Sequence, residues 1–236
     1  MTDDTLPTYR LDDDVAIITL DDGKANAFST AALEVLEGHL DRAIADGAQA
    51  LVVVGRPGRF SAGFALDEMT RDVTEMRALV VRGARFWMRL YGFGLPTVAA
   101  CTGHALAGGA ITLLSCDVRI GADVPAKIGL NEVAIGLTLP KFAAGLAADR
   151  LLPTAVAAAT MGAQVHDVAG AQAVGYLDHV VPAEDLLATA VEEARRLGQL
   201  DTAAYAGTKA NLRAELIERE LARVVEDMES LELPSI

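Results

Sequence analysis

Two glycine-containing stretches of the chain carry residue types that can stabilise negative charge. Gly108 and Gly109 separate a run rich in β-formers from an apolar segment, and Gly63 lies in Arg59–Leu66, directly after the strand-like run Ala50–Gly55. Glycine leaves backbone N–H groups uncovered, and the first turn of a helix has N–H groups without intrahelical partners. Two such loops can direct N–H groups at one oxygen, as an oxyanion hole requires. The glycine pair alone is equally consistent with close packing of a helix on a strand.

Glu132 is the candidate acid/base group. It precedes the uncharged run Val133–Leu137, and an apolar neighbourhood raises the pKa of a carboxyl group and suits it to proton transfer. From the residues alone, a surface glutamate at the start of a helix is the more common interpretation. The four histidines, among them His104, lack metal-ligand spacing. We therefore expect no metal site, and a structural hydrogen bond for His104.

Spacing excludes two other catalytic motifs. A nucleophile elbow around Ser61 needs glycine at the position of Arg59. The interval from Gly103 to Gly108 matches the first half of a phosphate-binding loop, but Gly109 stands where that loop needs lysine. The sequence therefore disfavours both a serine hydrolase and a nucleoside triphosphatase.

Several segments, in order along most of the chain, are similar to the signature regions of the crotonase family, the enoyl-CoA hydratases and isomerases. These segments are Gly23–Ala27, Phe60–Gly63, Ala107–Gly109, Ile128–Glu132 and Ala169–Val181. The resemblance implies that the N–H groups of Phe64 and Gly108 bind the thioester oxygen of an acyl-CoA and that Glu132 is catalytic. It also implies that no cofactor is needed besides the coenzyme A that is part of the substrate.

The same resemblance implies a set of substrate contacts. Lys24 and Ala25 are expected to flank the pantetheine and nucleotide part of CoA, although Lys24 is equally consistent with a solvated loop lysine. Further substrate contacts are expected at Ala62, Ala65, Leu66 and Gly109. At Ala65 the chain departs from the family, which commonly has an aspartate there, and we interpret the nearby Asp67 and Glu68 as solvated charges at a helix start.

Ile111 is the most informative departure from the family pattern. Crotonases that hydrate enoyl-CoA usually carry a second glutamate at this position, and isoleucine cannot hold or deliver a proton. Thr112 and Ser115 are weak acid/base groups on neighbouring faces. We therefore expect single-base chemistry through Glu132, with isomerisation of 3-enoyl-CoA to 2-enoyl-CoA favoured. The alternatives are hydration of 2-enoyl-CoA and a catalytically silent acyl-CoA-binding protein.

Hydrophobic periodicity predicts the elements that must position these residues. Ser29 is the expected N-cap of a helix whose apolar stripe includes Ile44, and Met76 and Trp87 are expected to be core residues of a helix over 70–91. Leu106 is assigned to the buried helix that follows the glycine pair. Other strands are expected over 8–20 (a hairpin), 50–55, 97–102, 117–122 and 127–130, and other helices over 141–150, 168–174, 184–197 and 202–231.

The resemblance implies a crotonase-like α/β fold of repeated ββα units with a helical C-terminal extension. We expect residues 1–180 to form the core domain and residues 181–236 to form a helical trimerisation or lid segment of the same domain. The final helix, with a stripe that includes Leu212, Leu216 and Leu221, packs on its own domain or covers a neighbour's site. A homotrimer or a dimer of trimers is expected.

Composition limits the partners of the chain. Its formal net charge of −13 argues against nucleic-acid binding, which needs clustered Lys and Arg. CoA is itself polyanionic, so basic residues should line its nucleotide end. Cys101 and Cys116 lie in apolar runs and are expected to be buried, reduced thiols. Residues 1–7 lack the features of a signal peptide and no run is long enough to span a bilayer, so we expect a cytoplasmic protein without membrane partners.

Overall fold

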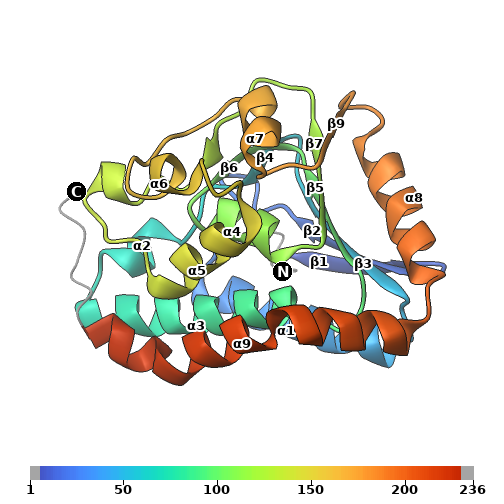
Figure 1. The fold of residues 1–236 in the computed structure, drawn as a ribbon, viewed down its shortest axis with the longest axis horizontal. Helices are drawn as coiled ribbons and strands as arrows, with labels where there is room; N and C mark the ends of the chain where they lie inside the picture. Colours follow the sequence, from blue (N-terminus) through green and yellow to red (C-terminus); the bar gives the residue numbers. More distant parts are fainter. Residues whose placement is uncertain (1–5, 230–236) are drawn as a thin grey trace.

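Two sheets and a layer of helices make up the computed structural model, which describes residues 6–229 (Figure 1). The larger sheet has the strand order β1-β2-β3-β5-β7-β9 and the smaller has the order β4-β6-β8. Every pairing is parallel except that of β1 with β2. The strands are β1 Thr8–Asp12, β2 Val15–Leu20, β3 Ala50–Gly55, β4 Gly58–Ser61, β5 Thr97–Cys101, β6 Gly103–Leu106, β7 Val118–Ala122, β8 Ile128–Gly129 and β9 His179–Val181.

Three ββα units give the fold its repeat. In each unit the first strand (β3, β5 or β7) joins the larger sheet, the second (β4, β6 or β8) joins the smaller sheet, and a helix follows. The expected crotonase-like architecture is therefore confirmed. The helices are α1 Thr30–Ala45, α2 Leu66–Met69, α3 Val73–Tyr91, α4 Gly108–Ser115, α5 Lys141–Arg150, α6 Val156–Ala159, α7 Val168–Val174, α8 Leu186–Gly198 and α9 Thr202–Glu229, with a 3-10 turn, η1, over Val133–Ile135.

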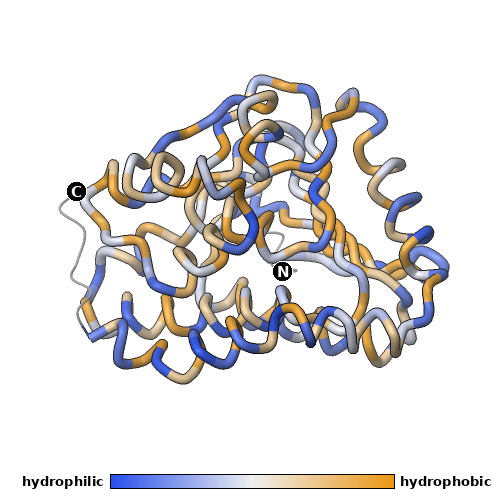
Figure 2. Tube along the Cα trace, in the orientation of Figure 1, coloured by the Kyte–Doolittle hydropathy of each residue, from blue (hydrophilic) through white to orange (hydrophobic). Residues whose placement is uncertain are grey.

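Both faces of the larger sheet are buried, because side chains alternate along each strand between two apolar layers. On one face, Val52, Val98 and Ile120 pack against α8. On the other face, Ile18 and Val53 join the main core with α1, α3 and α4. Figure 1 shows α8 on one side of the sheet and α4 on the other, and Figure 2 shows the apolar residues concentrated in the strands between them.

The α4 helix lies at the centre of the core, and all eight of its residues are buried. It begins at Gly108, as the glycine pair predicts, but Leu106 is not part of it. Leu106 ends β6, which pairs with β4 and β8 in the smaller sheet. The assignment of Leu106 to the helix was wrong because a strand of four residues is too short to show a period of its own.

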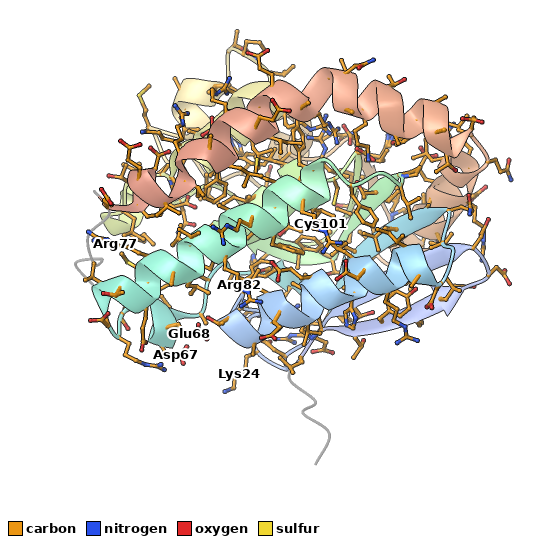
Figure 3. The ribbon with its side chains drawn as sticks, turned by 90° about the horizontal axis from the view of Figure 1, so that it is seen from below. Lys24, Asp67, Glu68, Arg77, Arg82 and Cys101 are labelled. Carbon is orange, nitrogen blue, oxygen red and sulfur yellow. The ribbon has the colours of Figure 1, made fainter. Side chains whose placement is uncertain are left out.

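The long α3 helix connects the core to two neighbouring helices. Met76 and Trp87 are fully buried in it, as expected for core residues. Asp72 caps its N-terminus by accepting from the backbone of Thr74, which explains why the helix starts at Val73 and not at 70. Arg82, labelled in Figure 3, donates to Glu37 of α1 at 3.1 Å and ties these two helices together.

Ser29 caps α1 as predicted, accepting from Ala32 at 3.0 Å. The stripe of α1 is shorter than expected, because Ile44 is exposed in the last turn, beyond the edge of the core. Glu68 is not a free solvated charge: its carboxylate accepts from the backbone and hydroxyl of Thr30, at the start of α1. Asp67 is solvent-exposed, in agreement with the prediction, and pairs loosely with Arg71.

The α9 helix packs on α3 and α5 of its own chain, and Figures 1 and 3 both show it running beside α3. Its buried cations Lys209 and Arg213 each contact Asp117 at 2.6 Å. Burial alone would raise the pKa of Asp117, but these two charges outweigh burial and hold the pKa low. Of the expected stripe, Leu216 is buried while Leu212 and Leu221 are exposed, and residues 230 and 231 of the predicted helix lie outside the described residues.

The two cysteines are free and buried, as predicted. Burial raises the pKa of both the Cys101 and the Cys116 thiol to about 12, so neither is a reactive thiolate. Over residues 6–229, no helix combines the length and the apolar character that a bilayer span requires. The expectation that no signal peptide is present rests on residues 1–7, and residues 1–5 lie outside the described part of the chain.

Candidate active site

The first candidate donor is the N–H of Phe64, whose loop is held by the backbone of Phe28. Phe28 donates to Gly63 O at 2.9 Å and accepts from Ala65 N at 3.1 Å, so it bonds the residues on both sides of Phe64. In a parallel pairing of this kind, the N–H of the middle residue points away from the partner. Among the backbone bonds of the described residues, none uses the Phe64 N–H. It is therefore available to a ligand.

The second candidate donor is the N–H of Gly108, the first residue of α4, which has no intrahelical acceptor. The preceding residue, Ala107, has φ 48° and ψ −118°, a backbone conformation that side chains disfavour. Its own N–H donates to Gly129 O at 3.1 Å and its carbonyl accepts from Ile111 N at 2.9 Å. Bonds on both sides of the peptide link thus hold the Gly108 N–H in place.

The two donor loops touch each other at Gly63. Its φ of +97° is left-handed, and a Cβ there would lie 2.9 Å from the Ala107 side chain and 3.1 Å from Gly108 N. Only glycine allows this approach. The structure therefore places the two loops that carry these N–H groups in contact, although the sequence separates Phe64 and Gly108 by more than 40 positions.

Gly109 serves packing instead. A Cβ at Gly109 would lie 2.3 Å from the carbonyl oxygen of Ser61, so the start of α4 can rest on the first donor loop only if this residue is glycine. Both interpretations of the glycine pair therefore apply: Gly109 permits close packing, and Gly108, whose N–H has no intrahelical acceptor, also lies where a Cβ would meet the Trp87 ring at 2.9 Å.

An apolar pocket with a cavity volume of about 90 Å³ opens beside the two donors. Glu132 is the single ionisable residue of its described lining. The lining residues are Ala62, Phe64, Leu66, Met69, Val80, Ala107, Gly108, Ile111, Glu132, Ile135, Leu137, Thr138, Pro140 and Phe142. The predicted site residues Glu132, Phe64, Gly108, Ala62 and Leu66 therefore share one pocket, together with Ile111.

Glu132 is 8% exposed, so the interpretation as a surface glutamate was wrong. It precedes the 3-10 turn η1, whose Ile135 also lines the pocket. Burial raises the pKa of Glu132 from 4.5 to about 7, opposed by a hydrogen bond from its own backbone. Its Oε2 has no hydrogen-bond partner in the described structure. A carboxyl group of this kind can accept and return a proton near neutral pH.

The neighbouring hydroxyls on α4 are engaged elsewhere. Thr112 donates to Gly108 O and Ser115 donates to Ile111 O, each at 2.8 Å, and both side chains are buried outside the pocket lining. Neither supplies the acid/base group that Ile111 lacks.

The other predicted substrate contacts lie outside the pocket lining. Ala65 precedes α2 with its N–H bonded to Phe28, and Gly109 is buried in the first turn of α4. Lys24 is exposed, and Figure 3 shows its side chain at the surface. Ala25 is partly buried, and its carbonyl accepts from Ala62 N at 3.0 Å. The segment that holds Lys24 and Ala25 is thus adjacent to the pocket through Ala62.

Asn26 is a structural residue of the site that the sequence reasoning did not single out. Its buried side-chain amide donates to Leu20 O at 2.7 Å and to Phe60 O at 3.1 Å, and its backbone carbonyl accepts from the Ser61 hydroxyl at 2.7 Å. Its φ of 54° is a conformation that asparagine tolerates better than most residues. An asparagine between small residues after a turn was the available signal.

Four basic residues on three segments of the chain, Lys24, Arg56 with Arg59, and Lys127, are linked by the contacts described next; we call them the basic rim. The Arg56 guanidinium donates to the backbone carbonyl of Lys24. The backbones of Arg56 and Arg59 form a β-bridge across a tight turn. His104 lies opposite Arg59 in β6, and its Nδ1 accepts from Lys127 N at 2.9 Å, which is the structural bond expected for it. Burial lowers the pKa of His104, and the charges of Arg59 and Lys127 lower it further.

Comparisons with known proteins agree with this geometry. The enoyl-CoA hydratase/isomerase family model matches residues 10–232. A probable enoyl-CoA hydratase of Bacillus subtilis is 34% identical over 158 residues, which cover 66% of this chain and 60% of that protein. The chain thus spans less than two thirds of that relative's length.

Two solved structures are similar over nearly the whole chain. An enoyl-CoA hydratase/isomerase family protein from Pseudomonas syringae has a TM-score of 0.93 and 38% identity, covering 96% of this chain and 98% of that one. The human mitochondrial delta3-delta2-enoyl-CoA isomerase has a TM-score of 0.91 and 29% identity, covering 94% and 89%. The relatives therefore include proteins named for both hydration and isomerisation.

Proposed function

The chain belongs to the enoyl-CoA hydratase/isomerase family of the crotonase superfamily and is an enzyme of that type, and we propose that it converts 3-enoyl-CoA thioesters to 2-enoyl-CoA thioesters. The observation that carries the proposal is that the described pocket lining contains a single carboxylate. This carboxylate is Glu132, and Ile111 lines the same pocket at the position where family members that hydrate usually have a second glutamate.

The proposed reaction moves one proton and one double bond. The Glu132 carboxylate removes a proton from C2, and the electron pair left behind forms a dienolate whose negative oxygen accepts from the N–H groups of Phe64 and Gly108. The same carboxyl group then returns the proton at C4, where the electron pair of the C3–C4 double bond forms the new C–H bond. The C1–C2 pair of the dienolate becomes the C2–C3 double bond, and an electron pair of the negative oxygen re-forms the thioester carbonyl. Protons and charge balance without water or a second acid/base group, so one positioned carboxylate is sufficient.

Hydration requires more polar groups than isomerisation does. Water must be oriented and deprotonated for attack at C3 while a proton is delivered at C2. The lining around Ile111 and Phe142 is apolar and offers Glu132 and Thr138 as its polar side chains. A water placed there would lack a second strong acceptor, which supports isomerisation over hydration.

The basic rim supports CoA as the carrier of the acyl group. The whole chain has a formal net charge of −13, yet Lys24, Arg56, Arg59 and Lys127 lie near one another, with Asp21 near Arg56 at 4.0 Å. Lys24 is on the segment that contacts the pocket residue Ala62. Clustered cations of this kind suit the phosphates of the nucleotide. No redox group or metal is part of the proposed chemistry.

A comparison of rates on one chain length tests the proposal. We expect wild-type protein to isomerise 3-octenoyl-CoA faster than it hydrates 2-octenoyl-CoA. Ile111→Glu should raise the ratio of hydration to isomerisation, and Ile111→Gln, of similar size but without a titratable group, should not. The proposal fails if the wild type hydrates faster than it isomerises. A wild type that binds octanoyl-CoA but catalyses neither reaction would indicate a silent acyl-CoA-binding protein.

The assembly remains a prediction: a homotrimer or a dimer of trimers. The exposed Leu212 and Val225 on α9 provide apolar surface for such contacts. Light scattering at micromolar concentration tests it, and a purely monomeric mass would refute it.

A further inference from the structure

Trp87 is the only tryptophan of the chain, and its ring lies against both candidate donor residues. Its centroid is 5.2 Å from that of the Phe64 ring, in an edge-to-face arrangement at 64°. A Cβ on Gly108 would lie 2.9 Å from two atoms of the indole ring. The ring is fully buried and outside the pocket lining, so it supports the donors from behind.

A chain of hydrogen bonds connects Trp87 to the start of α4. The indole Nε1 donates to Thr112 Oγ1 at 2.9 Å, and the Thr112 hydroxyl donates to Gly108 O at 2.8 Å. The single hydroxyl proton of Thr112 is committed to Gly108, so its oxygen is left to accept from the indole. Thr112 is 1% exposed, and hydrogen bonds between buried groups are stronger than those in contact with solvent.

Trp87 also supports the first donor loop through two aromatic contacts. Phe64 can lie against α3 because Gly83 has no side chain: a Cβ there would be 2.6 Å from Phe64 Cζ. Phe28, whose backbone holds the residues on both sides of Phe64, meets the Trp87 ring edge-to-face at 5.4 Å. One side chain of α3 thus contacts both loops of the oxyanion hole.

We propose that Trp87, acting through Thr112 and Phe64, is a positioning residue that fixes the distance between the Phe64 and Gly108 N–H groups. The inference rests on the proposed function, because it concerns the oxygen that these N–H groups would bind. A donor pair gives most to catalysis when it is held in place before the charge develops. A purely structural Trp87 would contribute to stability and leave the rate per folded molecule unchanged.

Two hydroxyls on α4 give a matched pair of variants. Thr112 and Ser115 are both buried and both donate to the carbonyl four residues earlier, at 2.8 Å. Thr112 alone joins Trp87 to Gly108, whereas Ser115 bonds Ile111. Thr112→Val and Ser115→Ala therefore each remove one back-bond from the same helix, and only the first cuts the link to the donor.

The kinetic test compares these variants as folded protein with 3-octenoyl-CoA. We expect Thr112→Val to lower kcat by about 10- to 100-fold with little change in KM, since small displacements of positioned groups cost this much. Ser115→Ala should stay near wild type, and Thr112→Ser should recover most of the loss. Trp87→Phe, which keeps an aromatic ring without the N–H, should match Thr112→Val, and the double variant should lose no more than either.

A second measurement separates this proposal from the proposed function. Nitrogen-15 labelling of the single tryptophan gives one indole N–H resonance. We expect octanoyl-CoA to move it in wild-type protein more than free CoA does, because only the thioester has a carbonyl oxygen for the hole. If wild-type protein neither responds to octanoyl-CoA nor turns over enoyl-CoA, the proposed function fails and the positioning role fails with it. If wild-type protein is active and Thr112→Val is as fast as Ser115→Ala, the positioning role alone fails.

Discussion

A buried carboxyl group with an oxygen that lacks a hydrogen-bond partner destabilises a fold when it ionises, and Glu132 is in this position. Its Oε2 is unpartnered and its pKa is raised to about 7 by burial. Between pH 4.5 and 7 the folded protein keeps a proton that the unfolded chain releases. Stability therefore falls as pH rises through this window, and the loss is complete above pH 7. The same desolvation that weakens the fold supplies a base of suitable strength.

Glu132→Gln should accordingly stabilise the protein while removing its activity. The difference between an ordinary pKa of 4.5 and a folded pKa of about 7 corresponds to about 3 kcal/mol. We expect the variant to exceed wild type in the free energy of unfolding by up to this amount at pH 8, and by much less at pH 4.5. Urea denaturation at the two pH values measures it. Glu34→Gln, on the exposed side of α1, is the control and should show no such gain.

Equal stability of Glu132→Gln and wild type at pH 8 would contradict the raised pKa. At this scale the sequence alone misjudged the residue, because a glutamate before an apolar run looks the same on a surface and at a pocket wall. The family resemblance supplied what the residues did not. Ile44 shows the converse: it fits the stripe of α1 but lies in a last turn that the core does not reach.

At the scale of elements, periodicity predicted α1, α3, α5, α7 and α8 to within a few residues, because each carries its own apolar pattern or cap. The short strands β4, β6 and β9 have three or four residues each. Their strand character comes from partners elsewhere in the chain, which a local pattern cannot reveal. The contact between Gly63 and the start of α4 depends on this pairing, so the donor geometry was implied by resemblance and not by periodicity.

Gly109→Ala tests how closely α4 rests on the first donor loop. The new Cβ would lie 2.3 Å from the backbone oxygen of Ser61, which cannot move without disturbing β4. We expect a loss of about 1 to 3 kcal/mol in the free energy of unfolding, typical of overpacking. Gly38→Ala, in the interior of α1 with nothing within 4 Å of the new Cβ, should instead stabilise by about 1 kcal/mol.

Thermal or urea denaturation of both variants measures these changes in the free energy of unfolding. A Gly109→Ala protein as stable as wild type would mean that the helix and the loop can separate, and that the donor pair is not held by this contact. If Gly38→Ala lowered the free energy of unfolding as much as Gly109→Ala does, the loss in Gly109→Ala could not be attributed to its contact with Ser61.

At the scale of the whole molecule, the chain combines a strongly negative net charge with a local basic rim. The need for basic residues at a nucleotide end was predicted from the charge of CoA. Their identity was not, apart from Lys24, because Arg59 and Lys127 come together only when β4 and β8 both pair with β6. The basic rim therefore depends on how the strands pair and does not occur as a continuous run of positive charge in the sequence.

Removing two charges from the rim should weaken binding of CoA thioesters and leave the chemistry intact. We expect Arg59→Gln/Lys127→Gln to raise KM for 3-octenoyl-CoA several-fold with kcat nearly unchanged, because rim charges act on association and binding. The pantetheine thioester of the same acid lacks the nucleotide and should show the same KM with wild type and variant. Arg10→Gln, on the exposed edge strand β1, is the charge control. An equal KM change with both thioesters would place the nucleotide elsewhere.

The central claim is that one shielded carboxylate, Glu132, carries a proton from C2 to C4 inside an apolar pocket. The most direct measurement is a single turnover of 3-octenoyl-CoA deuterated at C2, with enzyme in excess and in ordinary water. The predicted result is deuterium at C4 of a substantial share of the earliest product, and no conversion by Glu132→Gln. Product whose C4 hydrogen comes entirely from water at the earliest times, or unimpaired conversion by Glu132→Gln, would contradict it.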